Sequence, residues 1–284
     1  MKISESCFTN ARISQRELMS CLTLLRRLGG CFALFLLLPV LGLAQTGKPE
    51  LLLYCGITMV RPMTEIATLF EKRENVKITI AQGGSEDLYQ SAKKSGQGDV
   101  YLPGEPTYRS KHLAEGLLGD YLTVGYNQMA LMVQKGNPKK VTADPREMLR
   151  KDLIAIIGNA ESGSVGKEAK DILDDLGIYP KVIRQAAYLV PDSRSLTNAM
   201  KKGEADLTLN WRATAFFPDN LGKVEVIDLA PKLAKPQALL LNQLTFSRQK
   251  ELGKRFMAFT ASEEGQAIFR KYGFLDNKTP VDRK

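Results

Sequence analysis

The chain has 284 residues, of which 44% are apolar, 25% charged and 7% aromatic, and it contains 23 Gly, 13 Pro and a single His. This is the composition of a globular protein of one or two domains, and it excludes a disordered, collagen-like, coiled-coil or multi-span membrane protein. The formal net charge of +9 is basic, but part of it lies in a segment that the sequence predicts to be removed.

The first 44 residues have the pattern of a secretory signal peptide. Arg26 and Arg27 precede an apolar run over 31–43, and the run ends in Gly42-Leu43-Ala44, with small residues at the positions that a signal peptidase reads. A positive region, a short apolar region and a small-residue cleavage site define such signals. An apolar run of about 13 residues is shorter than the roughly 20 that a membrane-spanning helix needs. We therefore predict a signal peptide at residues 1–44, cleaved near Ala44, and a mature protein in the periplasm.

The mature chain differs from the full chain in charge and in cysteine content. Residues 1–44 hold five of the 40 Lys and Arg and two of the 31 Asp and Glu, so the mature charge is +6. They also hold three of the four cysteines, which leaves only Cys55 and no internal disulfide. A moderate positive charge without a dense basic block suits a soluble protein that meets small anions, and it does not favour nucleic acid.

Short β-rich runs alternate with helical patterns along the mature chain, which is typical of an α/β protein. In chain order we expect a strand at 51–54, a helix at 62–73, a strand at 76–80, a helix at 85–94, and strands at 99–102, 129–134 and 153–157. A helix at 165–176, a helix at 194–202, strands at 206–209, 224–227 and 237–246, and a last helix from about 260 to 272 follow. Ser85 is the predicted N-cap of its helix, and residues 260–263 are predicted to form a capping box that opens the last helix.

One local pattern occurs four times, with a loop bearing glycine or a hydroxyl leading into a helix. The four segments are Gly56-Ile57-Thr58, Gly83-Gly84-Ser85, Gly163-Ser164-Val165 and Asp192-Ser193-Arg194. Each helix start presents free backbone N–H groups and the positive end of a helix dipole, and a glycine or hydroxyl lets an oxyanion come close. Their distribution over the first and middle thirds of the chain predicts two lobes that direct helix ends into a shared cleft.

Several motifs resemble those of the periplasmic molybdate-binding proteins of ABC importers, which belong to the type II solute-binding proteins. The resemblance covers roughly residues 50–275. It is carried by Tyr54-Cys-Gly-Ile-Thr58, Ala81-Gln-Gly-Gly-Ser85, Gly98-Asp-Val-Tyr101, Gly163-Ser-Val165, Asp192-Ser-Arg194 and Glu264-Gly-Gln-Ala-Ile-Phe-Arg-Lys-Tyr-Gly-Phe274. The last stretch is typical of the superfamily and carries no information on the ligand.

This resemblance implies a two-lobed α/β fold with a mixed sheet in each lobe. Lobe I is expected to be discontinuous, at 48–126 and 235–284, lobe II to span 127–234, and the crossovers between them to form a hinge. The resemblance also implies a small oxyanion as ligand, molybdate or tungstate first, and an ABC-transporter permease as partner. We expect a monomer, no cofactor and no metal ligands other than the groups that hold the oxyanion.

The resemblance also assigns the ligand-binding residues. It places the two hydroxyl donors at Thr58 and Ser85, the backbone donors at Val165 and Ser193, and the position of the family's tyrosine at Trp211. Gly84, Ser164, Arg194 and Arg212 are secondary candidates. This chain departs from the family pattern in two ways. The indole of Trp211 offers one N–H, in a different place from the hydroxyl of a tyrosine. Lys167, Arg194 and Arg212 add charges that a site for a fully ionised oxyanion does not need. Phosphate, phosphonate, a sulfate-like anion and a small carboxylate therefore stay open as alternative ligands.

Other function classes have weaker support in the sequence. Residues 163–167 resemble the end of a phosphate-binding P-loop, but Glu168 stands where such a loop needs Ser or Thr. Cys55 and His112 lack the surrounding signature of a thiol protease, and no Gly-x-Ser-x-Gly motif of an esterase occurs. We therefore expect no enzyme. A secreted surface interaction protein or adhesin with the same fold and no transport role is a further alternative.

Overall fold

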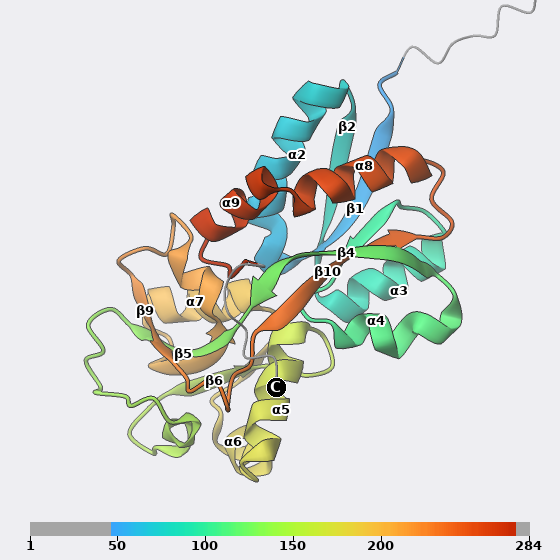
Figure 1. The fold of residues 1–284 in the computed structure, drawn as a ribbon. Coiled ribbons are helices and arrows are strands. Elements are labelled where there is room, and N and C mark those ends of the chain that lie inside the picture. Colours follow the sequence, from blue (N-terminus) through green and yellow to red (C-terminus); the bar gives the residue numbers. More distant parts are fainter. Residues whose placement is uncertain (1–46, 277–284) are drawn as a thin grey trace, which may run out of the picture. The chain divides into compact units, whose positions relative to one another are not determined.

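The structure, a computed structural model, describes residues 47–276; the predicted signal peptide and its cleavage site lie outside the described residues. Two five-stranded sheets are built from them (Figure 1). Sheet A has the order β2-β1-β3-β10-β4 and contains β1 (Glu50–Gly56), β2 (Lys77–Gly83), β3 (Val100–Leu102), β4 (Leu118–Asn127) and β10 (Gln237–Leu244). Sheet B has the order β7-β6-β8-β5-β9 and contains β5 (Met129–Gln134), β6 (Ala155–Gly158), β7 (Leu189–Val190), β8 (Leu207–Trp211) and β9 (Val224–Asp228).

Both sheets are mixed, and they share one pattern of strand directions. In sheet A, β1 is parallel to β2 and β3, while β10 is antiparallel to β3 and β4. In sheet B, β6 is parallel to β7 and β8, while β5 is antiparallel to β8 and β9. The predicted α/β fold with a mixed sheet in each lobe is confirmed. We call the part built on sheet A lobe I and the part built on sheet B lobe II.

Helices follow most of the strands. They are α2 (Val60–Glu74), α3 (Ser85–Ser95), α4 (Thr107–His112), α5 (Ser164–Asp175), α6 (Tyr179–Gln185), α7 (Ser193–Lys202), α8 (Lys250–Ala261) and α9 (Glu263–Lys271), with short 3-10 turns η1 (Ile57–Met59), η2 (Leu113–Glu115), η3 (Pro145–Leu149) and η4 (Arg212–Phe216). The helices expected at 62–73, 85–94, 165–176 and 194–202 are confirmed within a few residues. The sequence analysis did not predict α4, α6 or α8.

Two predicted helix caps are wrong. Ser85 is the first residue of α3, whose N-cap is Gly84, and the Ser85 hydroxyl accepts a hydrogen bond from the Gly104 N–H instead. The last helix, α9, is capped by Ser262, whose hydroxyl accepts from the Gly265 N–H. Thr260 belongs to α8, where its hydroxyl donates to the Phe256 carbonyl. In both places a tertiary or intrahelical partner competes for the hydroxyl that the sequence pattern assigned to a cap.

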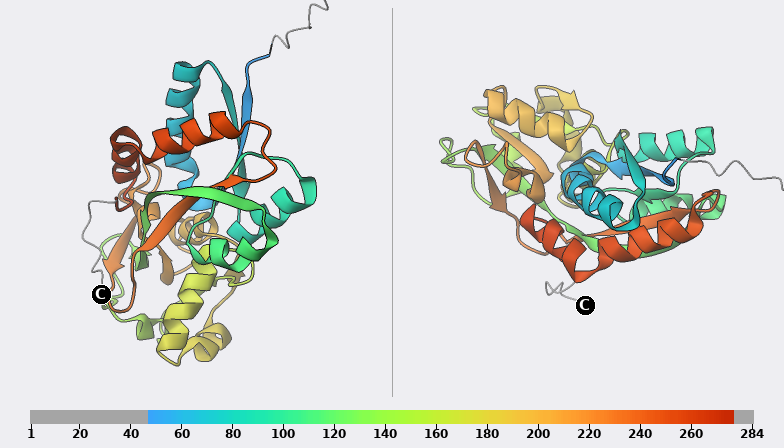
Figure 2. Two further views of the ribbon diagram at one scale, coloured as in Figure 1. Left: turned by 45° about the vertical axis from the view of Figure 1, so that its right-hand side comes forward. Right: turned by 90° about the horizontal axis from the view of Figure 1, so that it is seen from above.

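Sheet A has an apolar core on each face, because alternate residues of a strand point to opposite sides. Leu51, Leu53 and Cys55 of β1 belong to the core formed with α2, α8 and α9. Tyr54 belongs to a smaller core formed with α3 on the other face. The right-hand view of Figure 2 shows α8 and α9 (red) on the opposite side of the sheet from α3 (teal).

Lobe II has one continuous core, to which sheet B and helices α5, α6 and α7 contribute. Trp211, at the end of β8, is fully buried in it. The central strands β5, β6 and β8 are buried on both faces, as expected for strands covered by helices on both sides. This core fixes the ends of β6 and β8, from which the next loops depart.

The chain passes between the two sheets twice. β4 ends at Asn127 and β5 begins at Met129, so the first passage takes a single residue. The second passage lies between Asp228, the end of β9, and Gln237, the start of β10. The first passage lies within the crossover expected at 126–129, and the second overlaps in part the one expected at 234–238. The lobe boundaries at 126/127 and 234/235 stay a prediction.

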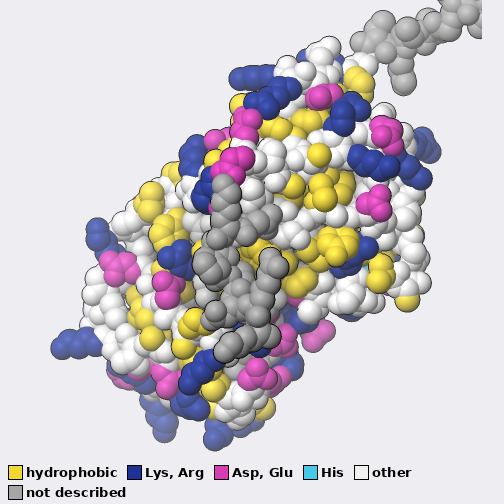
Figure 3. Space-filling view, in the orientation of Figure 1, with side chains coloured by type: hydrophobic (Ala, Val, Ile, Leu, Met, Phe, Trp, Pro, Cys, Tyr) yellow, Lys and Arg dark blue, Asp and Glu magenta, His cyan; other side chains and the backbone are white. Residues whose placement is uncertain are grey.

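Among residues 47–276, none of the helices has the length and apolar character needed to cross a membrane. Basic and acidic side chains are interspersed over the face shown in Figure 3.

Candidate functional site

The four strand-to-helix turns that the sequence singled out surround one small cavity. The residues lining this central cavity are Gly56, Ile57, Thr58, Met59, Gly83, Gly84, Ser85 and Gly104 from lobe I and Gly163, Ser164, Val165, Asp192, Ser193 and Trp211 from lobe II. The volume of this cavity is about 10 Å³. This is about the minimum that holds one water molecule, so the two lobes are close together around the cavity.

Lobe I contributes the ends of three parallel strands. β1 leads into η1 with Thr58, β2 leads through Gly83 and Gly84 into Ser85 of α3, and β3 leads to Gly104. Because β1, β2 and β3 are parallel, their carboxyl ends lie at one edge of the sheet, where ligands bind in open α/β folds.

Lobe II contributes the same arrangement from its own parallel strands. β6 leads into Ser164 and Val165 of α5, β7 leads into Ser193 of α7, and β8 ends at Trp211. The side chains of Ser164 and Ser193 are buried, and so are those of Thr58 and Ser85 across the cavity.

The hydroxyl groups of the central cavity have defined hydrogen-bond partners. The Ser85 Oγ accepts from the Gly104 N–H at 3.1 Å, and the Ser164 Oγ accepts from the Trp211 Nε1–H at 3.3 Å. Because a serine hydroxyl has one hydrogen to donate besides its acceptor lone pairs, both hydroxyls keep that hydrogen for another partner. The hydroxyls of Thr58 and Ser193 lie 2.7 Å apart, and this pair joins the two lobes.

The electrostatics of the cavity come from dipoles. The first N–H groups of α3, α5 and α7 have no partner within their own helices, and the N-terminal ends of these helices carry a partial positive charge. Asp192 is the sole lining residue with an ionisable side chain among those that the structure describes. Its Oδ1 accepts from the Ser195 N–H and caps α7. The lining therefore offers mainly hydrogen-bond donors, as an anion requires.

Two glycines permit the close approach of the lobes. A Cβ added to Gly84 would lie 2.1 Å from the carbonyl oxygen of Ser162, in the loop before α5. A Cβ added to Gly104 would lie 2.1 Å from the Oγ of Ser164. Since real Cβ atoms do not approach so closely, no other residue fits at either position while the lobes are in this arrangement.

The structure brings together most of the residues that the sequence selected. Thr58, Ser85, Val165, Ser193 and Trp211 all line the central cavity, as do the secondary candidates Gly84 and Ser164. Their role in binding a ligand stays a prediction.

Trp211 is not placed to donate a hydrogen bond directly to a ligand. Its side chain is fully buried, and its Nε1–H donates to the Ser164 Oγ. The indole therefore orients a serine hydroxyl, because its single N–H is already used.

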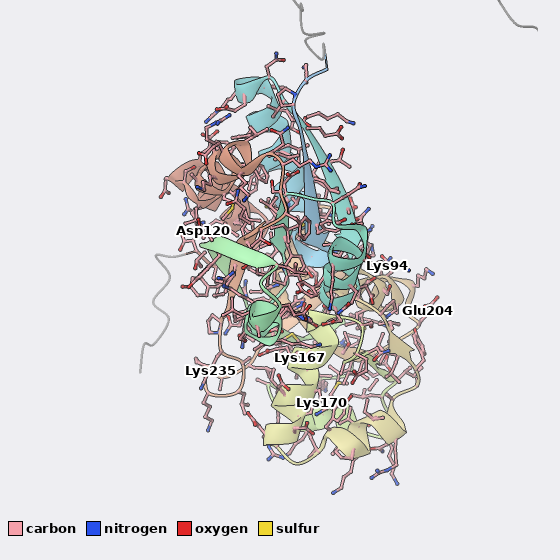
Figure 4. All side chains as sticks on the ribbon, turned by 90° about the vertical axis from the view of Figure 1, so that its right-hand side faces the viewer. Lys94, Asp120, Lys167, Lys170, Glu204 and Lys235 are labelled. Atoms are coloured by element: carbon pink, nitrogen blue, oxygen red, sulfur yellow. The ribbon has the colours of Figure 1, made fainter. Side chains whose placement is uncertain are left out.

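Three charged candidates lie outside the central cavity. Arg194 extends across to lobe I and donates to Gln82 Oε1 at 2.9 Å, on an exposed surface. Arg212 pairs with Asp228 at 2.8 Å and stacks on a neighbouring aromatic ring. Lys167 pairs with Asp171 at 2.7 Å, and Figure 4 shows it on α5. Each guanidinium or ammonium group has a polar partner outside the cavity, which the sequence could not reveal.

The sequence analysis missed Gly104. This residue follows β3 in the segment Pro103-Gly104, and β3 is parallel to β1. The signal was a glycine directly after a strand that ends at the same sheet edge as β1 and β2. Cys55 and His112, the two residues considered for a thiol protease, lie in different environments. Cys55 is buried in the core of lobe I, where burial raises the pKa of its thiol. His112 stacks on Tyr89.

Comparison with known proteins agrees with this architecture. The model of the family described as "Bacterial extracellular solute-binding protein" matches residues 51–275. A protein of Bacillus subtilis named "Putative ABC transporter substrate-binding lipoprotein YvgL" is 23% identical over 216 residues, which cover 75% of this chain and 81% of the relative.

Two solved structures show the same fold at low sequence identity. The periplasmic molybdate-binding protein of Azotobacter vinelandii has a TM-score of 0.68 and 15% identity, over 80% of this chain and 99% of the other. The sulfate-binding protein SubI of Mycobacterium tuberculosis has a TM-score of 0.68 and 14% identity, over 82% and 88% of the two chains. A two-lobed α/β fold and a family match over nearly all the described residues lead to one conclusion: the chain belongs to the family of bacterial extracellular solute-binding proteins.

Proposed function

We propose that this protein captures a small, fully ionised tetrahedral oxyanion between its lobes in the periplasm and delivers it to the permease of an ABC importer. Molybdate and tungstate are the first candidates. The observation that carries the proposal is the convergence of helix starts and four serine or threonine hydroxyls from both lobes on the central cavity.

The size of the cavity favours a small ligand. Pockets that hold drug-sized molecules measure roughly 300–1,000 Å³, whereas the central cavity measures about 10 Å³. A tetrahedral oxyanion is larger than one water molecule, and it fits once the Thr58 and Ser193 hydroxyls separate and each donates to it. A sugar or an amino acid would require the lobes to move much further apart.

The donors around the cavity favour an anion without a proton. Backbone N–H groups and hydroxyls stabilise ionised oxygens, but a protonated oxygen needs an acceptor. Among the described residues, Asp192 carries the one carboxylate in the lining, and its Oδ1 already caps α7. This arrangement supports molybdate, tungstate or sulfate over anions that keep a proton, such as hydrogen phosphate or a singly protonated phosphonate.

Delivery follows from a difference between open and closed lobes. The anion contacts both lobes only when they are closed, so its binding free energy favours the closed state. The two passages of the chain between the sheets are the proposed hinge, and the closed monomer is the proposed form that docks on the permease.

The direct test is calorimetry of the mature protein with molybdate, tungstate, sulfate, phosphate and a small carboxylate. We expect dissociation constants in the micromolar range or below for molybdate and tungstate and weaker binding for the others. Tight phosphate binding with no response to molybdate would contradict the choice of ligand. No binding of any of these anions would contradict the proposed function.

Replacing Ser85 by alanine is expected to weaken anion binding by about 1.5–3 kcal/mol, the usual contribution of a hydrogen bond to a charged group. The variant loses the hydroxyl donor and also leaves the Gly104 N–H without its acceptor. Calorimetry measures the change, and Ser91→Ala is the control, because Ser91 lies on the exposed side of the same helix. An unchanged affinity of Ser85→Ala would remove this residue from the site.

Anion binding is expected to change the fluorescence of Trp211. This is the single tryptophan of the chain, and its indole N–H donates to Ser164 at the edge of the cavity. Once the Ser164 hydroxyl donates to an anion, the polarity around the indole changes. A fluorescence titration should follow the calorimetric curve, and a constant signal at saturation would show that the indole does not sense the ligand.

A further inference from the structure

A second and larger cavity adjoins the central one on the side of α7. It measures about 410 Å³, and we call it the antechamber. Its lining includes Ile57, Thr58, Arg61, Ser193, Arg194 and Lys201. Three of these residues, Ile57, Thr58 and Ser193, also line the central cavity, and the Thr58–Ser193 hydroxyl pair lies between the two spaces.

The antechamber differs from the central cavity in its charge. Arg61 of lobe I and Arg194 and Lys201 of lobe II all line it. Its one carboxylate, Asp219, forms an ion pair with Arg61. Three cations against one acid leave an excess of positive charge in a space large enough for a hydrated anion.

Lys201 shows this excess most directly. Among the described residues, no carboxylate lies within ion-pair distance of its amine. The pKa of Lys201 is lowered, first because partial burial removes water from the ammonium group and then because Lys223 and, more weakly, Arg61 repel it; Asp219 acts in the opposite direction. An ammonium group in such surroundings is stabilised when an anion enters.

A shallow basin extends the positive surface beyond Lys201. Its lining includes Lys135, Lys201, Lys202 and Lys223. Lys201 lines both the basin and the antechamber, so the two positive surfaces meet at this residue, although Lys202 of the basin pairs with Glu204 at 3.5 Å.

We propose that the antechamber is a second, weaker anion site, which holds a divalent inorganic oxyanion on its way to the central cavity. The dipoles of the central cavity act over the first turn of each helix, whereas full charges attract an anion over a Debye length of about 10 Å at 0.1 M salt. The cations therefore supply the long-range attraction that the central donors lack. This inference rests on the proposed function, because it assumes that the central cavity receives the anion.

The kinetic test uses Lys201→Gln, which removes one cation outside the central cavity. Stopped-flow fluorescence of Trp211 with molybdate should show an association rate constant about three- to fivefold lower at low ionic strength, because charged clefts raise association rates by this mechanism. The dissociation rate constant should stay unchanged. At about 0.5 M salt the difference should disappear, since screening then acts within a few ångströms.

Lys94→Gln is the matched control. Lys94 is an exposed residue near the end of α3, outside both cavities, and Figure 4 shows its position. Lys94→Gln lowers the net charge by the same amount as Lys201→Gln. The association rate constant of Lys94→Gln should match that of the unmodified protein. Equal association rates for Lys201→Gln and Lys94→Gln at low salt would overturn the proposal.

A second measurement tests the antechamber independently of the central cavity. Sulfate titrated into protein with isotope-labelled lysines should shift the NMR signal of the Lys201 side chain, assigned by its loss in Lys201→Gln, and leave that of Lys94 unchanged. A shift of Lys201, with no tight binding of any of the tested anions by calorimetry, supports an anion site in the antechamber and contradicts the proposed function. A response of Trp211 with no shift of Lys201 supports the proposed function and overturns the antechamber.

Discussion

Replacing Gly84 by alanine is expected to lower the affinity for the anion by about a hundredfold, or ~2.7 kcal/mol, while the protein stays folded. The new Cβ would lie 2.1 Å from the backbone oxygen of Ser162 and 3.1 Å from Asp87 Oδ2. A backbone oxygen of the opposite lobe cannot give way as a flexible side chain can. The lobes would therefore close only with strain, and the affinity falls by the free energy of that strain.

The local backbone explains why the fold should survive this change. Gly84 has φ −65° and ψ 147°, an extended conformation that alanine adopts readily. The matched control is Gly83→Ala, one residue earlier, where the nearest atoms to an added Cβ belong to the Leu88 side chain at 3.5 Å and farther. Calorimetry measures the affinity and thermal unfolding measures the stability. Equal affinities of the two variants would show that closure does not require this contact.

Replacing Glu168 by glutamine is expected to stabilise the protein by about 2–3 kcal/mol above pH 7. Glu168 lies on α5 and is buried, which raises the pKa of its carboxyl to about 7, first through desolvation; a hydrogen bond from Gln237 acts in the opposite direction. The buried carboxyl of Glu105 and that of Asp171 raise this pKa further, and Lys167 lowers it.

The direction of the pH effect follows from proton binding. Between pH 4.5, the ordinary pKa of a glutamate, and about 7, the folded state binds more protons at Glu168 than the unfolded state, so stability falls as pH rises. Above pH 7 Glu168 is ionised in both states, so the folded state carries the full free-energy cost of burying the charge. Glutamine avoids this cost and keeps an oxygen that accepts from Gln237.

Thermal unfolding at several pH values tests this prediction. Glu168→Gln should raise the melting temperature by about 5–10 °C at pH 8, since 1 kcal/mol corresponds to ~2–4 °C in a protein of this size. At pH 4 the variant and the unmodified protein should melt together. Glu225→Gln is the control, because Glu225 is exposed on β9. A gain at pH 4 as large as at pH 8 would refute the explanation by charge burial.

The family resemblance selected the residues that line the central cavity better than local rules did. Thr58, Ser85, Val165 and Ser193 were selected through motifs at strand ends, and the structure brings all four to one cavity. The capping rules failed at Ser85 because the Gly104 N–H, nineteen residues away, competes for the same hydroxyl. Partners distant in the sequence leave no trace in the local pattern.

The sequence by itself determined the fold class, since the alternation of apolar strands and helical segments depends on local periodicity. It also marked the helix starts, because glycine and hydroxyl residues are required where a chain turns from strand to helix. Only the tertiary structure decided which charges face the cavities. Arg194, Arg212 and Lys167 carry the same charge in the sequence, yet each lies outside the central cavity, because long side chains take the direction of their ion-pair and hydrogen-bond partners.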